Sequence, residues 1–109
     1  MEIFYASSEI EAAALSEGAL AKIFGTNARK ACQRLFDLAA TESLAVAAAL
    51  PMLKLTQQAG MARFSVSVSS TNRILFEPVL DSGAATSAKE IDLASVTAVR
   101  ILALGGTHD

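Results

Sequence analysis

The sequence is poor in the residues that build covalent crosslinks and metal centres. Its 109 residues include one cysteine, one histidine and no tryptophan. Cys32 therefore cannot form an internal disulfide, and its apolar helical neighbours predict a buried, inert thiol rather than a nucleophile. A single histidine cannot supply a cluster of histidine ligands, so we expect no metal site. This cysteine usage fits a reducing compartment.

Long apolar runs and cofactor motifs are also missing, although 52% of the residues are hydrophobic. The most apolar stretch, residues 44–55, is interrupted by Pro51 and Lys54 and falls short of the ~20 apolar residues of a membrane span. Glu2 stands where a signal peptide would carry basic residues. No GxGxxG, Walker A, CxxC or GxSxG pattern occurs. We therefore expect a cytoplasmic protein with no small-molecule cofactor and no membrane partner.

The length predicts a single domain over residues 1–109 whose first half is helical. Residues 3–5 form a short apolar run that predicts an edge strand. Ser7 or Ser8 then caps a helical segment that Gly18 weakens or divides and that Gly25 ends. Thr26 or Asn27 caps a second helix, whose apolar positions recur every three to four residues: Ala28, Ala31, Cys32, Leu35 and Leu38. Thr41 to Leu50 give a third, shorter helix capped by Thr41 and stopped by Pro51.

After Pro51 the period of the apolar pattern changes from helical spacing to two. Residues 63–68 and 72–77 predict an antiparallel hairpin, and residues 96–104 predict a last strand after a long connection. Because side chains alternate across a strand, the basic residue of each run points away from the core; these residues are Arg63, Arg73 and Arg100. The apolar residues expected to point inward are Phe64, Val66, Val68, Ile74, Phe76, Val99, Ile101 and Ala103.

If the three runs pair in one sheet, the three arginines share an open face of a chain whose net charge is −2. Such a face indicates a partner that carries phosphate or carboxylate groups. The alternative is that each arginine is a solvated surface residue paired with an acid such as Glu77, an interaction worth ~0–1 kcal/mol. His108 follows two glycines near the end of the sequence, a position that favours a solvated tail over a catalytic group.

The order of these elements resembles the RelE/ParE toxin superfamily, and most closely its HigB-like killer proteins of plasmid maintenance systems. The resemblance covers nearly the whole chain and rests on three stretches: ALSEGALAKIFGTNARKACQRLFDLAATESL, RFSVSVSSTNRILFEP and DLASVTAVRILALGGTHD. It implies an α+β fold in which a short N-terminal strand and a helical hairpin pack on a small antiparallel sheet.

The resemblance also implies a function: the toxin of a type II toxin–antitoxin system, acting as a ribosome-dependent mRNA endonuclease. Its partners would be the ribosome, mRNA and a small helix-turn-helix antitoxin. In-line attack of a ribose hydroxyl on phosphate develops charge that guanidinium groups stabilise. By matching position, Arg73 and Arg63 are the candidate phosphate-stabilising residues and His108 the candidate acid or base. Lys54 and Arg100 are the candidate RNA-binding residues.

Two positions depart from the family pattern. Asn72 and Thr107 stand where the family has tyrosines, and neither can stack on a base. Two further functions therefore stay open. One is a ParE-like, non-enzymatic poison of DNA gyrase, and the other is a catalytically inactive chain that binds an antitoxin only.

Overall fold

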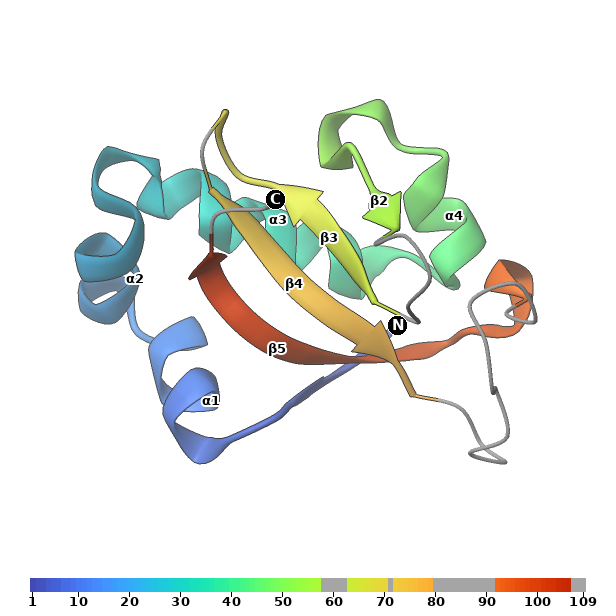
Figure 1. Cartoon of the computed structure of the whole chain (residues 1–109), viewed down its shortest axis with the longest axis horizontal. Helices are drawn as coiled ribbons and strands as arrows, with labels where there is room; N and C mark the ends of the chain where they lie inside the picture. Colours follow the sequence, from blue (N-terminus) through green and yellow to red (C-terminus); the bar gives the residue numbers. More distant parts are fainter. Residues whose placement is uncertain (58–62, 71, 80–91, 107–109) are drawn as a thin grey trace.

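The computed structural model describes residues 1–57, 63–70, 72–79 and 92–106. Its helices and strands form an α+β fold, which confirms the fold class expected from the sequence (Figure 1). The α-helices are α1 (Ser8–Ala14), α2 (Glu17–Phe24), α3 (Ala28–Ala40) and α4 (Leu44–Ala48). The strands are β1 (Glu2–Tyr5), β2 (Thr56–Gln57), β3 (Phe64–Ser67), β4 (Arg73–Pro78) and β5 (Ala98–Gly106).

Serine side chains set the starts of the first two helices. The Ser7 hydroxyl accepts a hydrogen bond from the Ile10 amide at 3.1 Å, so Ser7 is the cap of the two serines that the sequence offered. The division expected near Gly18 is present, but it lies two residues earlier, where the Ser16 hydroxyl accepts from the Ala19 amide at 3.2 Å. Gly25 ends α2 with φ +59°, a value that favours glycine. Asn27, one of the two residues expected to cap the next helix, is the N-cap of α3 but makes no side-chain capping hydrogen bond.

The predicted cap of the third helix was wrong. Thr41 closes α3 instead, because its hydroxyl donates to the Leu38 carbonyl at 2.7 Å. The cap of α4 is Ser43, whose hydroxyl accepts from the Val46 amide at 3.4 Å. Both residues have an extended backbone, so either one suits a helix boundary and the sequence pattern alone does not separate them.

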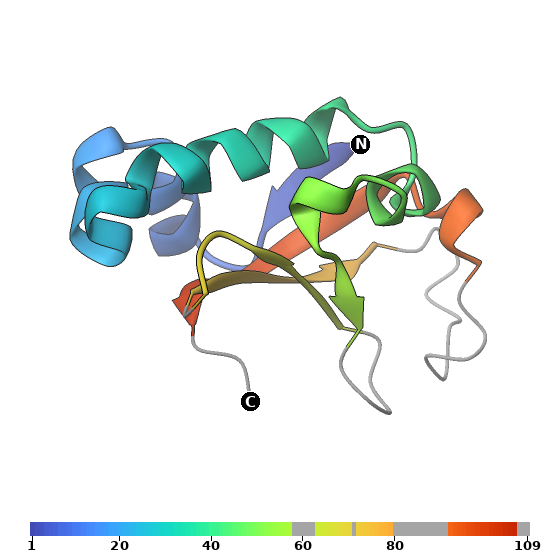
Figure 2. The same cartoon turned by 90° about the horizontal axis from the view of Figure 1, so that it is seen from above.

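The strands form one sheet with the order β1-β5-β4-β3-β2. Neighbours from β2 to β5 are antiparallel, which confirms the predicted hairpin, and β1 lies at the edge parallel to β5. Figure 2 shows α3 running along one face of the sheet, with α1 and α2 at one end and α4 at the other. The opposite face carries no helix among the described residues and is called the open face below.

The core lies between the helices and the sheet, and the strand alternation expected for β3 and β4 is confirmed. Phe64, Val66, Ile74 and Phe76 are all 1% exposed or less, and the Phe64 and Phe76 rings lie 6.0 Å apart. The expectation for the end of β5 was wrong for Ala103. The inward positions of β5, in order, are Val99, Ile101 and Leu104.

A β-bulge explains the change. Phe76 pairs with Ile101 but its neighbour Leu75 pairs with Ala103, so Leu102 is an extra residue in β5. A second irregularity lies at Gly105, which has φ +74°. The bulge at Leu102 puts Leu104 opposite Ile74 and moves Ala103 to the open face with Leu75.

Candidate functional site

Arg100 lies in a row of side chains across the open face. The strand register places it beside Phe4 of β1 and Glu77 of β4. Its Nη1 atom donates to Glu77 Oε1 at 2.7 Å, and the two side chains are 44% and 29% exposed. An exposed pair of this kind contributes ~0–1 kcal/mol. Arg100 therefore matches the alternative given above, in which each arginine is a surface residue paired with an acid such as Glu77.

Arg73 is also on the face opposite the core, but it does not face solvent as we expected. It is 9% exposed, and its guanidinium makes four hydrogen bonds. Nε donates to Ser65 Oγ at 2.7 Å, and Nη2 donates to the Ser65 carbonyl at 3.2 Å. Nη2 also lies 2.6 Å from the Lys54 carbonyl and 3.0 Å from Thr56 Oγ1. The side chain thus ties β4 to β3 and to the segment that leads into β2.

The Lys54 residue that accepts from Arg73 has an unusual backbone conformation. Lys54 has φ +45° and ψ +51°, a left-handed conformation that costs a non-glycine residue roughly 1 kcal/mol. The conformation follows a 3₁₀ turn over Pro51–Leu53 and accompanies a carbonyl bonded to Arg73. Burial lowers the pKa of the Arg73 guanidinium, because desolvation disfavours its charged form.

The predicted cationic residues share a face without forming one cluster. Arg73 and Glu77, the partner of Arg100, are four residues apart on β4, which corresponds to roughly 13 Å along the strand. Arg63 is exposed and directly precedes β3, where the register continued from Phe64 and Phe76 places it opposite Glu77. The structure therefore brings Arg73 together with Lys54, and it brings Arg100 together with Glu77.

The remaining predicted site residues are Lys54, Arg63 and His108. The Lys54 side chain is exposed, and neither it nor Arg63 forms an ion pair within the described residues. His108 and Thr107 lie outside the described residues. On the described part of the open face, an exposed cation such as Arg63 can bind an anion. The Arg73 guanidinium already donates hydrogen bonds to the protein from Nε and Nη2.

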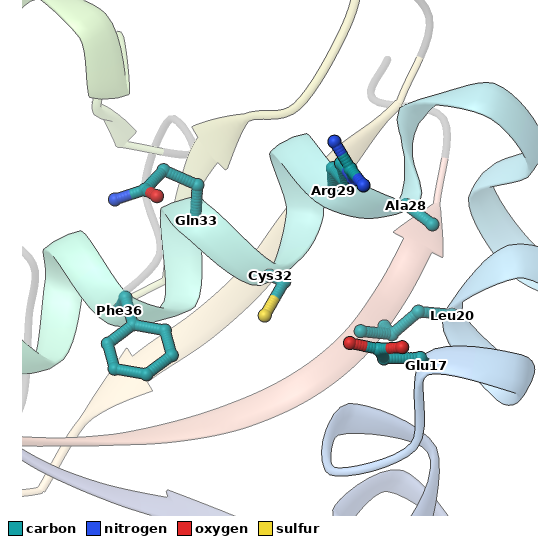
Figure 3. Close-up of a pocket in the computed structure, with 7 residues that line it drawn as sticks. All are labelled: Glu17, Leu20, Ala28, Arg29, Cys32, Gln33 and Phe36. Carbon is teal, nitrogen blue, oxygen red and sulfur yellow. The ribbon is translucent and has the colours of Figure 1, made fainter.

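The helical side carries a groove that the sequence reasoning missed. It lies between α2 and α3 and has a volume of about 430 Å³ (Figure 3). Phe36 is 69% exposed and stands at one end. Cys32, which we expected to be buried, is half-buried and lines the groove. The remaining lining residues are Glu17, Leu20, Ala28, Arg29 and Gln33.

A signal for this groove was present in the sequence. Phe36 falls on the face of α3 that otherwise carries Arg29 and Gln33, so it breaks the polar pattern of that face. An isolated exposed apolar residue is common, and only its position beside a concave surface makes it informative.

The described residues contain neither a cluster of metal ligands nor a membrane-spanning helix. Within residues 1–57, 63–70, 72–79 and 92–106, no three His, Cys, Asp or Glu side chains gather closely enough to hold a metal ion. No helix in these ranges has both the length and the apolar character needed to span a bilayer.

The fold and the open face define the class of the protein as a small α+β domain with a helical hairpin on one side of a mostly antiparallel sheet. Comparison of the chain with protein-family models, with curated proteins and with solved structures gave no match.

Proposed function

We propose that this chain is the toxin of a type II toxin–antitoxin system and acts in the cytoplasm as a ribosome-dependent mRNA endonuclease. The observation that carries the proposal is the arrangement of the fold. A short N-terminal strand, a helical hairpin and an antiparallel sheet occur in the order that the resemblance to RelE/HigB-like toxins implies, and no helix of the described residues covers the open face. A small helix-turn-helix antitoxin, the ribosome and mRNA are the proposed partners.

Within this proposal the two arginines have different roles. Arg63 is exposed and is our candidate for contact with the RNA phosphates, together with Lys54. Nη2 of Arg73 is already bonded to the Lys54–Thr56 segment, and this atom becomes available to a phosphate only if that segment moves away. The first role of Arg73 is therefore to position that segment.

The experiment is primer extension on mRNA incubated with ribosomes and the purified chain. We expect cleavage that requires ribosomes and that falls about 10²-fold or more in Arg63→Ala, if Arg63 stabilises charge in the transition state. Lys22→Ala is the control, because it removes an exposed positive charge from α2 on the helical side of the fold. Absence of cleavage on active ribosomes would refute the enzymatic function.

A specific observation favours a second candidate, a non-enzymatic toxin of the ParE kind. The best-matched catalytic residue, Arg73, is buried and hydrogen-bonded, and Asn72 replaces the neighbouring family tyrosine. A protein that inhibits DNA gyrase by contact needs neither group in a reactive state. Inhibition of gyrase supercoiling by a chain that leaves mRNA intact would identify this function, and inactivity in both assays with retained antitoxin binding would identify an inactive binding protein.

A further inference from the structure

A short segment at the edge of the sheet lies against Arg73 on the open face. It consists of residues 54–57, which follow the 3₁₀ turn that ends at Leu53 and include the strand β2, and it is called the latch below. β2 is the edge strand beside β3 (Figure 1), and both of its residues are exposed. Leu53, directly before the latch, is fully buried and anchors it at one end.

The latch uses the donor that Arg73 needs in order to bind an anion with two nitrogens. Nη2 has two hydrogens, and its acceptors are the Lys54 carbonyl at 2.6 Å, Thr56 Oγ1 at 3.0 Å and the Ser65 carbonyl at 3.2 Å. Thr56 Oγ1 also donates to the Lys54 carbonyl at 3.2 Å, which joins the two latch acceptors. A phosphate bound in a bidentate way uses Nη2 together with Nε or Nη1. It must therefore take Nη2 from the latch.

The guanidinium of Arg73 is buried without an opposite charge among the described residues. Arg73 is 9% exposed, and its four hydrogen bonds all end on neutral oxygens. The ion pairs found in the described part of the chain lie elsewhere, at Arg34 and at Arg100. A phosphate carries a full negative charge, so its attraction to this guanidinium exceeds that of a neutral carbonyl. A phosphate can therefore compete with the latch for Nη2.

The closed latch also keeps Lys54 in a disfavoured conformation. Its φ of +45° and ψ of +51° are left-handed, which is unfavourable for a residue with a side chain. Release of the carbonyl from Arg73 allows this residue to return to an extended backbone while Leu53 stays in the core. The Lys54 side chain is exposed, so the part that moves carries a cation of its own.

We propose that the latch is an autoinhibitory contact, in which the Lys54 carbonyl and the Thr56 hydroxyl occupy Arg73 until a phosphate group displaces them. The inference rests on the proposed function, under which this phosphate belongs to single-stranded RNA. The closed latch lowers the apparent affinity for phosphate, because only molecules with an open latch bind it fully. By linkage, a bound phosphate favours the open latch to the same extent.

NMR titration of the full chain with inorganic phosphate at constant ionic strength tests this coupling. The nitrogen resonance of Arg73 Nε reports binding, and the Cα chemical shift of Lys54 reports whether its backbone is left-handed. We expect both signals to change with one midpoint. A change at Arg73 while Lys54 stays left-handed would overturn the proposal, and so would the absence of any change at Arg73.

A weakened latch provides a second test. Thr56→Val removes the hydroxyl but keeps the shape of the side chain, so the midpoint for phosphate should fall about two- to tenfold, the range expected for one hydrogen bond. Thr56→Ser keeps the hydroxyl and should leave the midpoint unchanged. Thr97→Val is the matched control, because Thr97 is exposed and directly precedes β5. Equal midpoints for Thr56→Val and Thr97→Val would refute the inhibitory role of the latch.

Two comparisons separate the latch from the proposed function. A short single-stranded RNA should open the latch at a lower concentration than inorganic phosphate does, and an equal or higher concentration would overturn the assignment to RNA. Ribosome-dependent cleavage is measured independently on the same protein. Cleavage by a chain whose Lys54 signal ignores phosphate would refute the latch alone, whereas phosphate-dependent opening in a chain that cleaves no mRNA would support the latch and refute the endonuclease.

Discussion

Replacing Arg73 with alanine should destabilise the fold. The guanidinium makes two buried hydrogen bonds to Ser65 and two partly buried bonds to Lys54 and Thr56. A hydrogen bond to a charged group contributes about 1.5–3 kcal/mol to stability. When the guanidinium is removed, acceptors near the surface recover much of this free energy by bonding to water. Counting the two buried bonds at about 1.5 kcal/mol each gives a loss of about 3 kcal/mol. For a chain of this length the midpoint of thermal unfolding should fall by about 10–15 °C.

Thermal and urea unfolding followed by circular dichroism would measure this loss. Arg100→Ala is the matched control, because it removes the same side chain from the same face of the sheet, where its ion pair with Glu77 is partly exposed. Its expected cost is ~0–1 kcal/mol. Arg73→Lys should recover only part of the stability, since an ammonium group cannot reproduce the planar set of donors. Equal midpoints for Arg73→Ala and Arg100→Ala would refute the structural role of Arg73.

Three further perturbations test the packing and the electrostatics. Gly105→Ala should lower the free energy of unfolding in urea by about 1–3 kcal/mol, because Gly105 has φ +74° and a Cβ atom there would lie 2.4 Å from Ile23 Cγ2. Gly18→Ala is the control: Gly18 lies within α2 without such a contact, so its substitution should be neutral or stabilising. Burial and the Glu11 carboxylate raise the pKa of Tyr5, so stability should hold below about pH 10 and decline as the pH rises further, and this decline should be reduced in Tyr5→Phe. Phe76→Ala should cost about 3–5 kcal/mol because the ring is fully buried, and the same truncation of exposed Phe36 should change the unfolding midpoint little.

The helices and the hairpin were predictable because their signals are local. Ser7 precedes a helical pattern and Gly25 follows one, so the sequence alone locates both boundaries. Alternation along β3 and β4 likewise identified the inward faces of Phe64 and Phe76. These features depend on residues within a few positions of one another.

Apart from the cap assigned to Thr41, the errors occurred where distant segments meet. Arg73 is buried because the Lys54–Thr56 segment bonds to it, and no pattern within β4 reports that contact. The bulge at Leu102 reversed the alternation expected for Ala103, since a bulge depends on how two strands pair rather than on one of them. The groove depends on how α2 lies beside α3. Each missed feature of the candidate site therefore belongs to tertiary structure.

The parallel pairing of β1 with β5 joins the beginning of the fold to its end. Glu2 lies opposite Ala98 in this pairing, so closing the contact brings together segments separated by most of the chain. Loop closure over that distance opposes folding by about 4 kcal/mol, from (3/2)RT ln n. During synthesis β1 is made before the other four strands of this sheet, and it has no strand partner until β5 has been made. The helical hairpin can form early, but the sheet edge at β1 is completed last, so nascent chains expose this edge to association with other chains until translation has passed β5.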